Sequence, residues 1–86
     1  MSEEPNDRVI LYVRQECHLC DEARSVVAEV AAATGVGWAE VDVDETPQAA
    51  ATYGELVPVV TVDGVQQGYW RLDPRRIRRA VEAGRA

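Results

Sequence analysis

The sequence predicts one α/β domain with the element order βαβ-α-ββα, in which helices flank a four-stranded mixed sheet. Apolar runs of strand length alternate along the chain with segments of helical periodicity. Two residue pairs typical of helix starts and one typical of a hairpin divide the second half of the chain. At 86 residues the chain can bury one hydrophobic core and leaves no room for a second domain.

The first half of the chain is expected to form a parallel βαβ unit. Residues 9–12 are a continuous apolar run, typical of a strand that is covered on both faces. From Cys20 onward apolar residues recur at helical spacing as far as Gly35, which is a good helix C-cap. Residues 38–43 then alternate between two faces and predict a second strand. A strand, a crossover helix and a second strand form a right-handed parallel unit.

The second half is expected to form a short helix, a hairpin and a terminal helix. Thr46-Pro47 joins a capping hydroxyl to a proline at the first helical position, and Gly54 is a good stop. Asp63-Gly64 is a strong hairpin signal, so two antiparallel strands are expected, at residues 59–62 and 65–69. Asp73-Pro74 repeats the pattern of a capping residue followed by proline and opens the last helix.

Charge and hydropathy argue against a secreted protein, a membrane protein and a nucleic-acid-binding protein. Residues 1–8 are acidic and polar and are expected to form a disordered tail, with the folded domain at residues 9–86. They lack the parts of a secretory signal, and no apolar stretch approaches the ~20 residues of a membrane span. We therefore expect a cytoplasmic protein without membrane association. The net charge of −6, without any lysine, argues against nucleic-acid binding.

The arginines are concentrated near the C-terminus, where residues 71–79 hold five of the nine. A solvated helix face explains such a run most simply, because Ile77, Ala80 and Val81 supply an apolar stripe on the other side. A docking surface for an acidic partner is the alternative interpretation.

The only two cysteines, Cys17 and Cys20, lie three positions apart where the first strand gives way to a helix. A disulfide between them closes a minimal loop, so it suits a bond that opens and closes better than a structural crosslink. A helix N-terminus stabilises a thiolate, which makes Cys17 the candidate nucleophile and Cys20 the candidate resolving thiol. A protonated His18 favours the thiolate, whereas Asp21 and Glu22 oppose it, and the sequence does not decide between these effects.

The Cys17-His18-Leu19-Cys20 motif, followed at this distance by Val57-Pro58, resembles the small bacterial glutaredoxin-like proteins of the thioredoxin superfamily. The resemblance extends over residues 9–83 and implies a thioredoxin-like fold of the glutaredoxin type. It also implies a cis Pro58 that faces the cysteines, a Val57 backbone that pairs with an extended substrate, and an Arg14 that meets a carboxylate of glutathione.

One segment departs from this family. Glutaredoxins commonly follow the last strand with a Gly-rich turn that binds the γ-glutamyl end of glutathione, but residues 68–73 read Gly-Tyr-Trp-Arg-Leu-Asp. Only Asp73 can serve that purpose, and it can equally cap the last helix. Tyr69 and Trp70 are either groove walls or, more commonly for such residues, part of the core. Glutathione, another low-molecular-weight thiol and thioredoxin reductase all remain candidate reductants.

The sequence thus predicts a monomeric thiol-disulfide oxidoreductase, with no bound cofactor or metal, that reduces protein or mixed disulfides. Its partners would be a disulfide-containing protein or small thiol and an electron donor. Two alternatives are a non-catalytic redox-sensing or binding module and a metal or iron-sulfur carrier. The carrier would need a dimer or an exogenous thiol, because the chain has no second CxxC motif.

Overall fold

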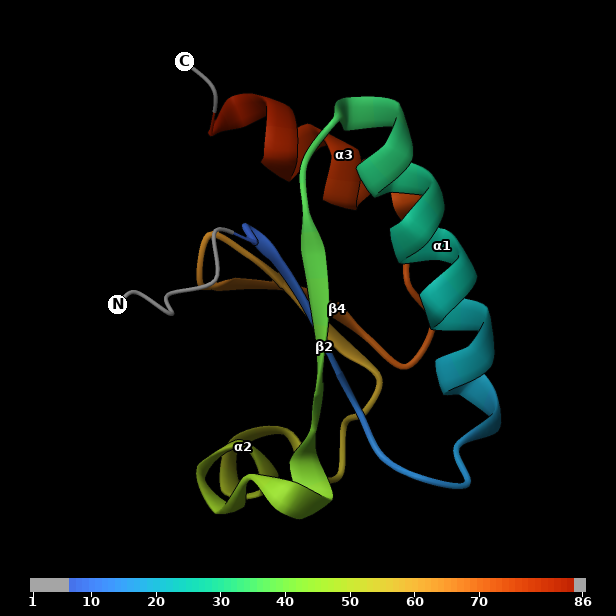
Figure 1. The fold of residues 1–86 in the computed structure, drawn as a ribbon, viewed down its shortest axis with the longest axis vertical. Helices are drawn as coiled ribbons and strands as arrows, with labels where there is room; N and C mark the ends of the chain where they lie inside the picture. The colour runs from blue at the N-terminus through green and yellow to red at the C-terminus, as the bar shows by residue number, and fades with distance from the viewer. Residues whose placement is uncertain (1–6, 85–86) are drawn as a thin grey trace.

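A four-stranded sheet and three α-helices make up the computed structural model, which describes residues 7–84 (Figure 1). The elements are β1 (Val9–Val13), α1 (His18–Thr34), β2 (Trp38–Asp42), the 3-10 turn η1 (Val43–Glu45), α2 (Pro47–Tyr53), β3 (Val59–Val62), β4 (Val65–Tyr69) and α3 (Pro74–Ala83). The sheet order is β2-β1-β3-β4, in which only the β1–β2 pair is parallel. This is the mixed α/β sheet that the sequence predicts. Within the described range no helix is both long and apolar enough to cross a bilayer.

Local signals place most element ends where the sequence predicts them. Gly35 ends α1 in the left-handed conformation, with φ of 77°, and its N–H donates to the Ala31 carbonyl at 2.8 Å. Asp63 and Gly64 form the hairpin turn, both with positive φ, as such two-residue turns require. The Asp73 carboxylate accepts a hydrogen bond from the Arg75 N–H at 3.0 Å and so caps α3.

Two expectations in the β2–α2 connection are wrong. Val43 does not extend β2, because the Asp42 carboxylate accepts a hydrogen bond from the Asp44 N–H at 2.9 Å and turns the chain into η1. Val43 is fully buried there instead. The Thr46 hydroxyl does not cap α2: it donates to the Asp42 carbonyl at 3.1 Å, which leaves Pro47 as the local signal for the helix start.

The apolar core lies between one face of the sheet and the helices α1 and α3, which pack side by side (Figure 1). Alternate residues of β1 point into this core, namely Val9, Leu11 and Val13. Ile77 and Val81 of α3 close it from the C-terminal end of the chain. On the opposite face Tyr12 is half-buried, and its ring lies 4.6 Å from the ring of Tyr53 in α2. One face of β1 is therefore fully buried in the core, whereas the face that carries Tyr12 is only partly buried.

Arg8 joins three distant segments of the fold. Its guanidinium binds both carboxylate oxygens of Asp63 in the hairpin turn, each at 2.8 Å, and also donates to the Val81 carbonyl in α3 at 3.0 Å. Arg8, the last residue of the expected tail at residues 1–8, is thus bound to two elements of the domain. Residues 1–6 of that tail lie outside the described residues. Hydrogen bonding to Arg8 lowers the pKa of Asp63 below its ordinary value.

We predict that the Asp63 carboxylate stabilises the fold in a pH-dependent manner. A carboxylate whose pKa is lower in the folded state contributes stability above its unfolded pKa of about 3.9, and this contribution disappears as the pH falls through the folded pKa. Asp63→Asn keeps a residue that tolerates positive φ but removes the charge. Urea unfolding should show Asp63→Asn less stable than the wild type at pH 7, with a difference that shrinks in acid.

Glu22→Gln is the matched control, because Glu22 is an exposed carboxylate on α1. Its effect on the free energy of unfolding should be small at every pH. A loss in Asp63→Asn that is the same at pH 7 and in acid would contradict the ion-pair explanation.

Candidate functional site

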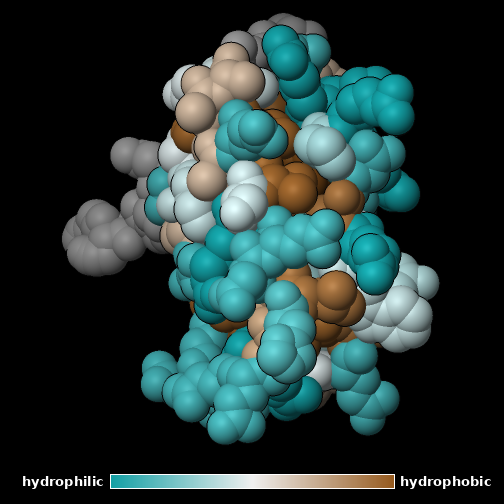
Figure 2. All heavy atoms as spheres, turned by 90° about the vertical axis from the view of Figure 1, so that its right-hand side faces the viewer, coloured by the Kyte–Doolittle hydropathy of each residue, from teal (hydrophilic) through white to brown (hydrophobic). Residues whose placement is uncertain are grey.

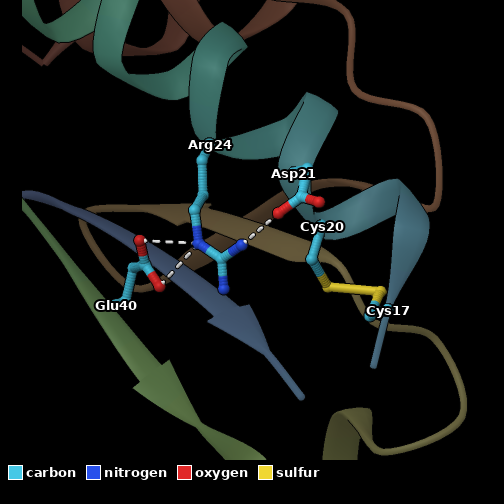
Figure 3. A network of polar contacts seen from close by, with 5 residues as sticks. All are labelled: Cys17, Cys20, Asp21, Arg24 and Glu40. Atoms are coloured by element: carbon cyan, nitrogen blue, oxygen red, sulfur yellow. Dashed lines mark hydrogen bonds and ion pairs between the residues drawn. A yellow bond between two sulfur atoms is a disulfide. The ribbon is translucent and has the colours of Figure 1, made fainter. Parts of the chain in front are cut away.

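Cys17 and Cys20 are joined by a disulfide across the first turn of α1 (Figure 3). Their Cα atoms are 5.3 Å apart, which is within the usual range for a disulfide. Cys17 is the N-cap residue, with extended backbone angles, and its carbonyl accepts a hydrogen bond from the Cys20 N–H at 3.2 Å. The geometry that the CxxC spacing predicts is therefore present.

The two cysteines differ in exposure. Cys20 is fully buried among the core residues under α1, whereas Cys17 is only partly buried at the helix N-terminus. Of the two cysteines, only Cys17 therefore has surface that is open to solvent. The unpaired N–H groups and the macrodipole at this helix end favour negative charge on Cys17 once the disulfide is reduced.

An ion-pair network that the sequence analysis missed lies beside the disulfide. Figure 3 shows the Asp21 and Glu40 carboxylates converging on the guanidinium of Arg24. Asp21 is 2.7 Å from it, and both Glu40 oxygens are 3.0 Å from it. Hydrogen bonding to Glu40 raises the pKa of Arg24 above its ordinary value. The negative charge of Asp21 is thus paired, which reduces its expected opposition to a thiolate; the i,i+3 spacing of Asp21 and Arg24 was a signal for this pair.

A polar pocket of about 240 Å³ opens next to Cys17. It is lined by Arg14, Gln15, Glu16, Cys17, His18, Asp21 and Arg24. His18 is exposed at the first position of α1. The charged and polar side chains of this lining favour a ligand with charged or hydrogen-bonding groups over an apolar one.

Arg14 lies on the rim of this pocket but is already bound to the protein. Its guanidinium donates to the Gly54 carbonyl at 2.9 Å and to the Asp44 carboxylate at 3.1 Å. These contacts hold η1 and the end of α2 against the chain that leaves β1. Sequence reasoning had no signal for these partners, because they are 30 and 40 residues away along the chain.

Strand register brings three separate segments to the same edge of the sheet, the one at which β1 and β4 end and β3 begins. Val59 at the start of β3 lies opposite Tyr12 near the end of β1 and opposite Tyr69 at the end of β4. The chain toward the cysteines, the residue before Val59 and the residue after Tyr69 therefore leave the sheet at the same edge. The residue before Val59 is Pro58, which is buried, and its peptide bond with Val57 is cis, as the resemblance implies.

Tyr69 and Trp70 are exposed at this edge, so the interpretation that they belong to the core is wrong. Their exposed fractions are 45% and 52%, and their rings contact each other edge to face at 5.2 Å. The Trp70 N–H donates to the Pro58 carbonyl at 2.8 Å, which places Trp70 directly beside the cis-proline segment. β4 is an edge strand of the sheet. The carboxylate of Asp73, the remaining candidate binding residue, is used in capping α3.

Metal-ligating residues do not gather near the cysteines. In residues 7–84, no group of three or more His, Cys, Asp or Glu side chains is arranged to hold a metal ion.

Comparison with known proteins identifies relatives over most of the chain. Residues 8–82 match the family described as Glutaredoxin-like domain (DUF836). The uncharacterized protein Rv0508 of Mycobacterium tuberculosis is 32% identical over 76 residues, which are 83% of this chain and 78% of that protein. The sequence similarity thus covers both the cysteine pair and the proline segment.

Solved structures show the same fold. The protein XcR50 from X. campestris is 30% identical, with a TM-score of 0.69 over 87% of this chain and 96% of that one. A thioredoxin variant from Halobacterium salinarum is 28% identical, with a TM-score of 0.59 over 90% of this chain and 74% of that one. The predicted thioredoxin-like fold is thereby confirmed.

We predict that reduced Cys17 reacts with an alkylating reagent before Cys20. Burial denies the reagent access to Cys20, and the helix N-terminus increases the thiolate fraction of Cys17. Limited iodoacetamide treatment of the reduced protein, followed by peptide mass spectrometry, should place nearly all of the first label on Cys17. In urea both residues should label similarly, and preferential or equal labelling of Cys20 in the folded protein would contradict the assignment.

Proposed function

This chain belongs to the glutaredoxin-like domain family, and we propose that it is a thiol-disulfide oxidoreductase that reduces disulfides through Cys17 and Cys20. The observation that carries the proposal is the disulfide across the first turn of α1, in which one cysteine is accessible and the other is buried. A crosslink between residues three apart adds little to stability, so its presence favours redox chemistry. The 28% identity with a thioredoxin supports the same class of reaction.

The reaction begins with Cys17 in the reduced protein. Its thiolate attacks one sulfur of the substrate disulfide, forms a mixed disulfide and releases the other substrate sulfur as a thiolate, which takes up a proton. Cys20 then loses its proton and attacks the sulfur of Cys17. This step breaks the mixed disulfide, closes the Cys17–Cys20 bond and releases the second substrate thiol. The substrate gains two electrons and the protein loses two.

A donor must return two electrons to the Cys17–Cys20 disulfide. We infer that a low-molecular-weight thiol or a dithiol reductase does so, in the reducing cytoplasm where such donors are present. In this proposal the protein acts as a monomer without a resident metal or cofactor. Val57 offers its backbone to an extended substrate beside the cis Pro58. Arg14 and Asp73 are the other substrate-binding residues of this proposal.

Glutathione fits this site poorly. The Gly-rich turn of glutaredoxins is replaced by a segment in which Trp70 has φ of 61°, a conformation that a glycine adopts without strain. The indole ring therefore occupies space that a glycine would leave open. Arg14 and Asp73, the remaining polar anchors, are bound to Asp44 and to the α3 backbone.

We predict that Cys17 is the nucleophile and Cys20 the resolving thiol, and that substitutions at each position have different effects. Cys17→Ser should abolish disulfide reduction, because no thiolate remains at the accessible position. Cys20→Ser should accumulate a one-to-one covalent adduct with a disulfide peptide, because nothing resolves the mixed disulfide. Intact-protein mass spectrometry without reductant measures both outcomes. Absence of an adduct in Cys20→Ser, or an adduct in Cys17→Ser, would argue against this mechanism.

We predict that glutathione is a poor donor for this protein. Each missing polar contact costs about 1 kcal/mol, so turnover in the glutathione-coupled assay should be about tenfold or more below turnover with a thioredoxin-reductase type donor. Trp70→Gly is the matched variant, because it removes the ring and suits positive φ. Glutathione turnover should rise in Trp70→Gly. Wild-type activity with glutathione that equals activity with the dithiol donor would contradict the inference.

A further inference from the structure

Three arginines at the start of α3 and on its outer face carry charges that the fold does not use. Arg71, Arg75 and Arg79 are exposed, and within residues 7–84 none of their guanidinium groups forms an ion pair. Arg75 and Arg79 lie one helical turn apart and point away from the buried Ile77 and Val81, and Arg75 also lines a pocket beside Glu29 and Ala33 of α1. In contrast, Arg8, Arg14, Arg24 and Arg78 each bind a carboxylate.

Helix electrostatics gives no local reason for this arrangement. The first turn of α3 contains Arg75 and Arg76, although the positive end of the helix macrodipole disfavours cations there. The last turn, where cations are favourable, contains no basic residue. Figure 2 shows hydrophilic side chains over both ends of this face, including the end where α3 lies, with exposed apolar atoms between them.

In the sequence, Arg71 directly follows the exposed aromatic pair Tyr69 and Trp70. Trp70 is hydrogen-bonded to Pro58 through its backbone, and Arg71 is the next residue. The positive φ of Trp70 is an unfavourable conformation for a bulky residue, and the ring is not buried in return. The rings and Arg75 are thus placed at some cost to the free protein, and Trp70 lies beside the cis-proline segment.

We propose that this surface, defined as Tyr69, Trp70, Arg71, Arg75 and Arg79, docks an acidic segment of a protein substrate next to the disulfide to be reduced. The proposal rests on the proposed function and names the substrate class. Planar guanidinium groups bind carboxylates in bidentate fashion, and exposed Tyr and Trp rings supply an apolar anchor at low entropic cost. Residues 71–79 contain a single acidic residue, Asp73, among five arginines, whereas the whole chain has a net charge of −6.

The charge distribution favours an acidic protein segment over an extended polyanion. A nucleic acid or an anionic membrane would also face the acidic remainder of the chain, which repels it. A short acidic segment contacts the arginines alone. The acidic surface elsewhere on the protein also disfavours binding of the same segment in another place.

The test uses two fluorescent peptides with the same disulfide loop and the same aromatic residue, one flanked by glutamates and the other by glutamines. A second pair has serines in place of the cysteines, so that anisotropy measures docking without chemistry. The glutamate peptides should bind wild-type protein more tightly and be reduced faster by pre-reduced protein, by roughly three- to tenfold, and 0.5 M NaCl should weaken this preference. The double variant Arg75→Gln/Arg79→Gln should lose the preference.

Arg78→Gln is the control, because it removes one positive charge from the same helix at an arginine that is already paired with Glu82. It should keep the preference for the glutamate peptides. Equal binding of glutamate and glutamine peptides, or a preference that survives in Arg75→Gln/Arg79→Gln, would overturn the docking proposal. Tighter binding of single-stranded RNA or phosphatidylserine vesicles than of the glutamate peptide would also overturn it. Preferential docking without any reduction would support this surface and refute the oxidoreductase function instead.

Discussion

The antiparallel pairing of β3 with both β1 and β4 is the constraint on which the site depends. Because Val59 lies opposite Tyr12 and Tyr69, three segments that are far apart in the sequence leave the sheet at one edge. One carries the cysteine pair, one the cis-proline and one the exposed aromatic rings. A shift of register by one residue would turn each side chain to the other face of the sheet and separate these parts.

The same core that supports the sheet also makes the two thiols unequal. Cys20 faces the core beneath α1, together with Ala23 and Val27, and so it is covered. Cys17 lies just before the helix, where it contacts the core only in part. Helix geometry thus converts a sequence spacing of three residues into one accessible and one protected sulfur, which is the asymmetry that stepwise thiol-disulfide exchange requires.

The arginines of the described residues fall into two groups, those that form ion pairs and those that form none. Arginines that join elements are paired: Arg8 binds the hairpin turn and α3, Arg14 binds η1 and the end of α2, and Arg24 binds β2. Arg75 and Arg79 of α3 form no ion pair within residues 7–84. The paired arginines stabilise contacts between elements, whereas Arg75 stands at a helix N-terminus where its charge is unfavourable, and this contrast distinguishes structural arginines from candidate recognition residues.

The sequence by itself determined the element order, the hairpin, the cap of α3 and the position of the cysteine pair at a helix start. These features follow from residues close together in the chain, such as Asp63-Gly64, whose backbone preferences act locally. Only the tertiary structure decided that Arg8 belongs to the domain, that Arg14 binds Asp44, and that Trp70 is exposed beside the proline segment. Such contacts depend on which distant segments the strand register brings together, and on which edge of the sheet is left uncovered, so local preference cannot encode them.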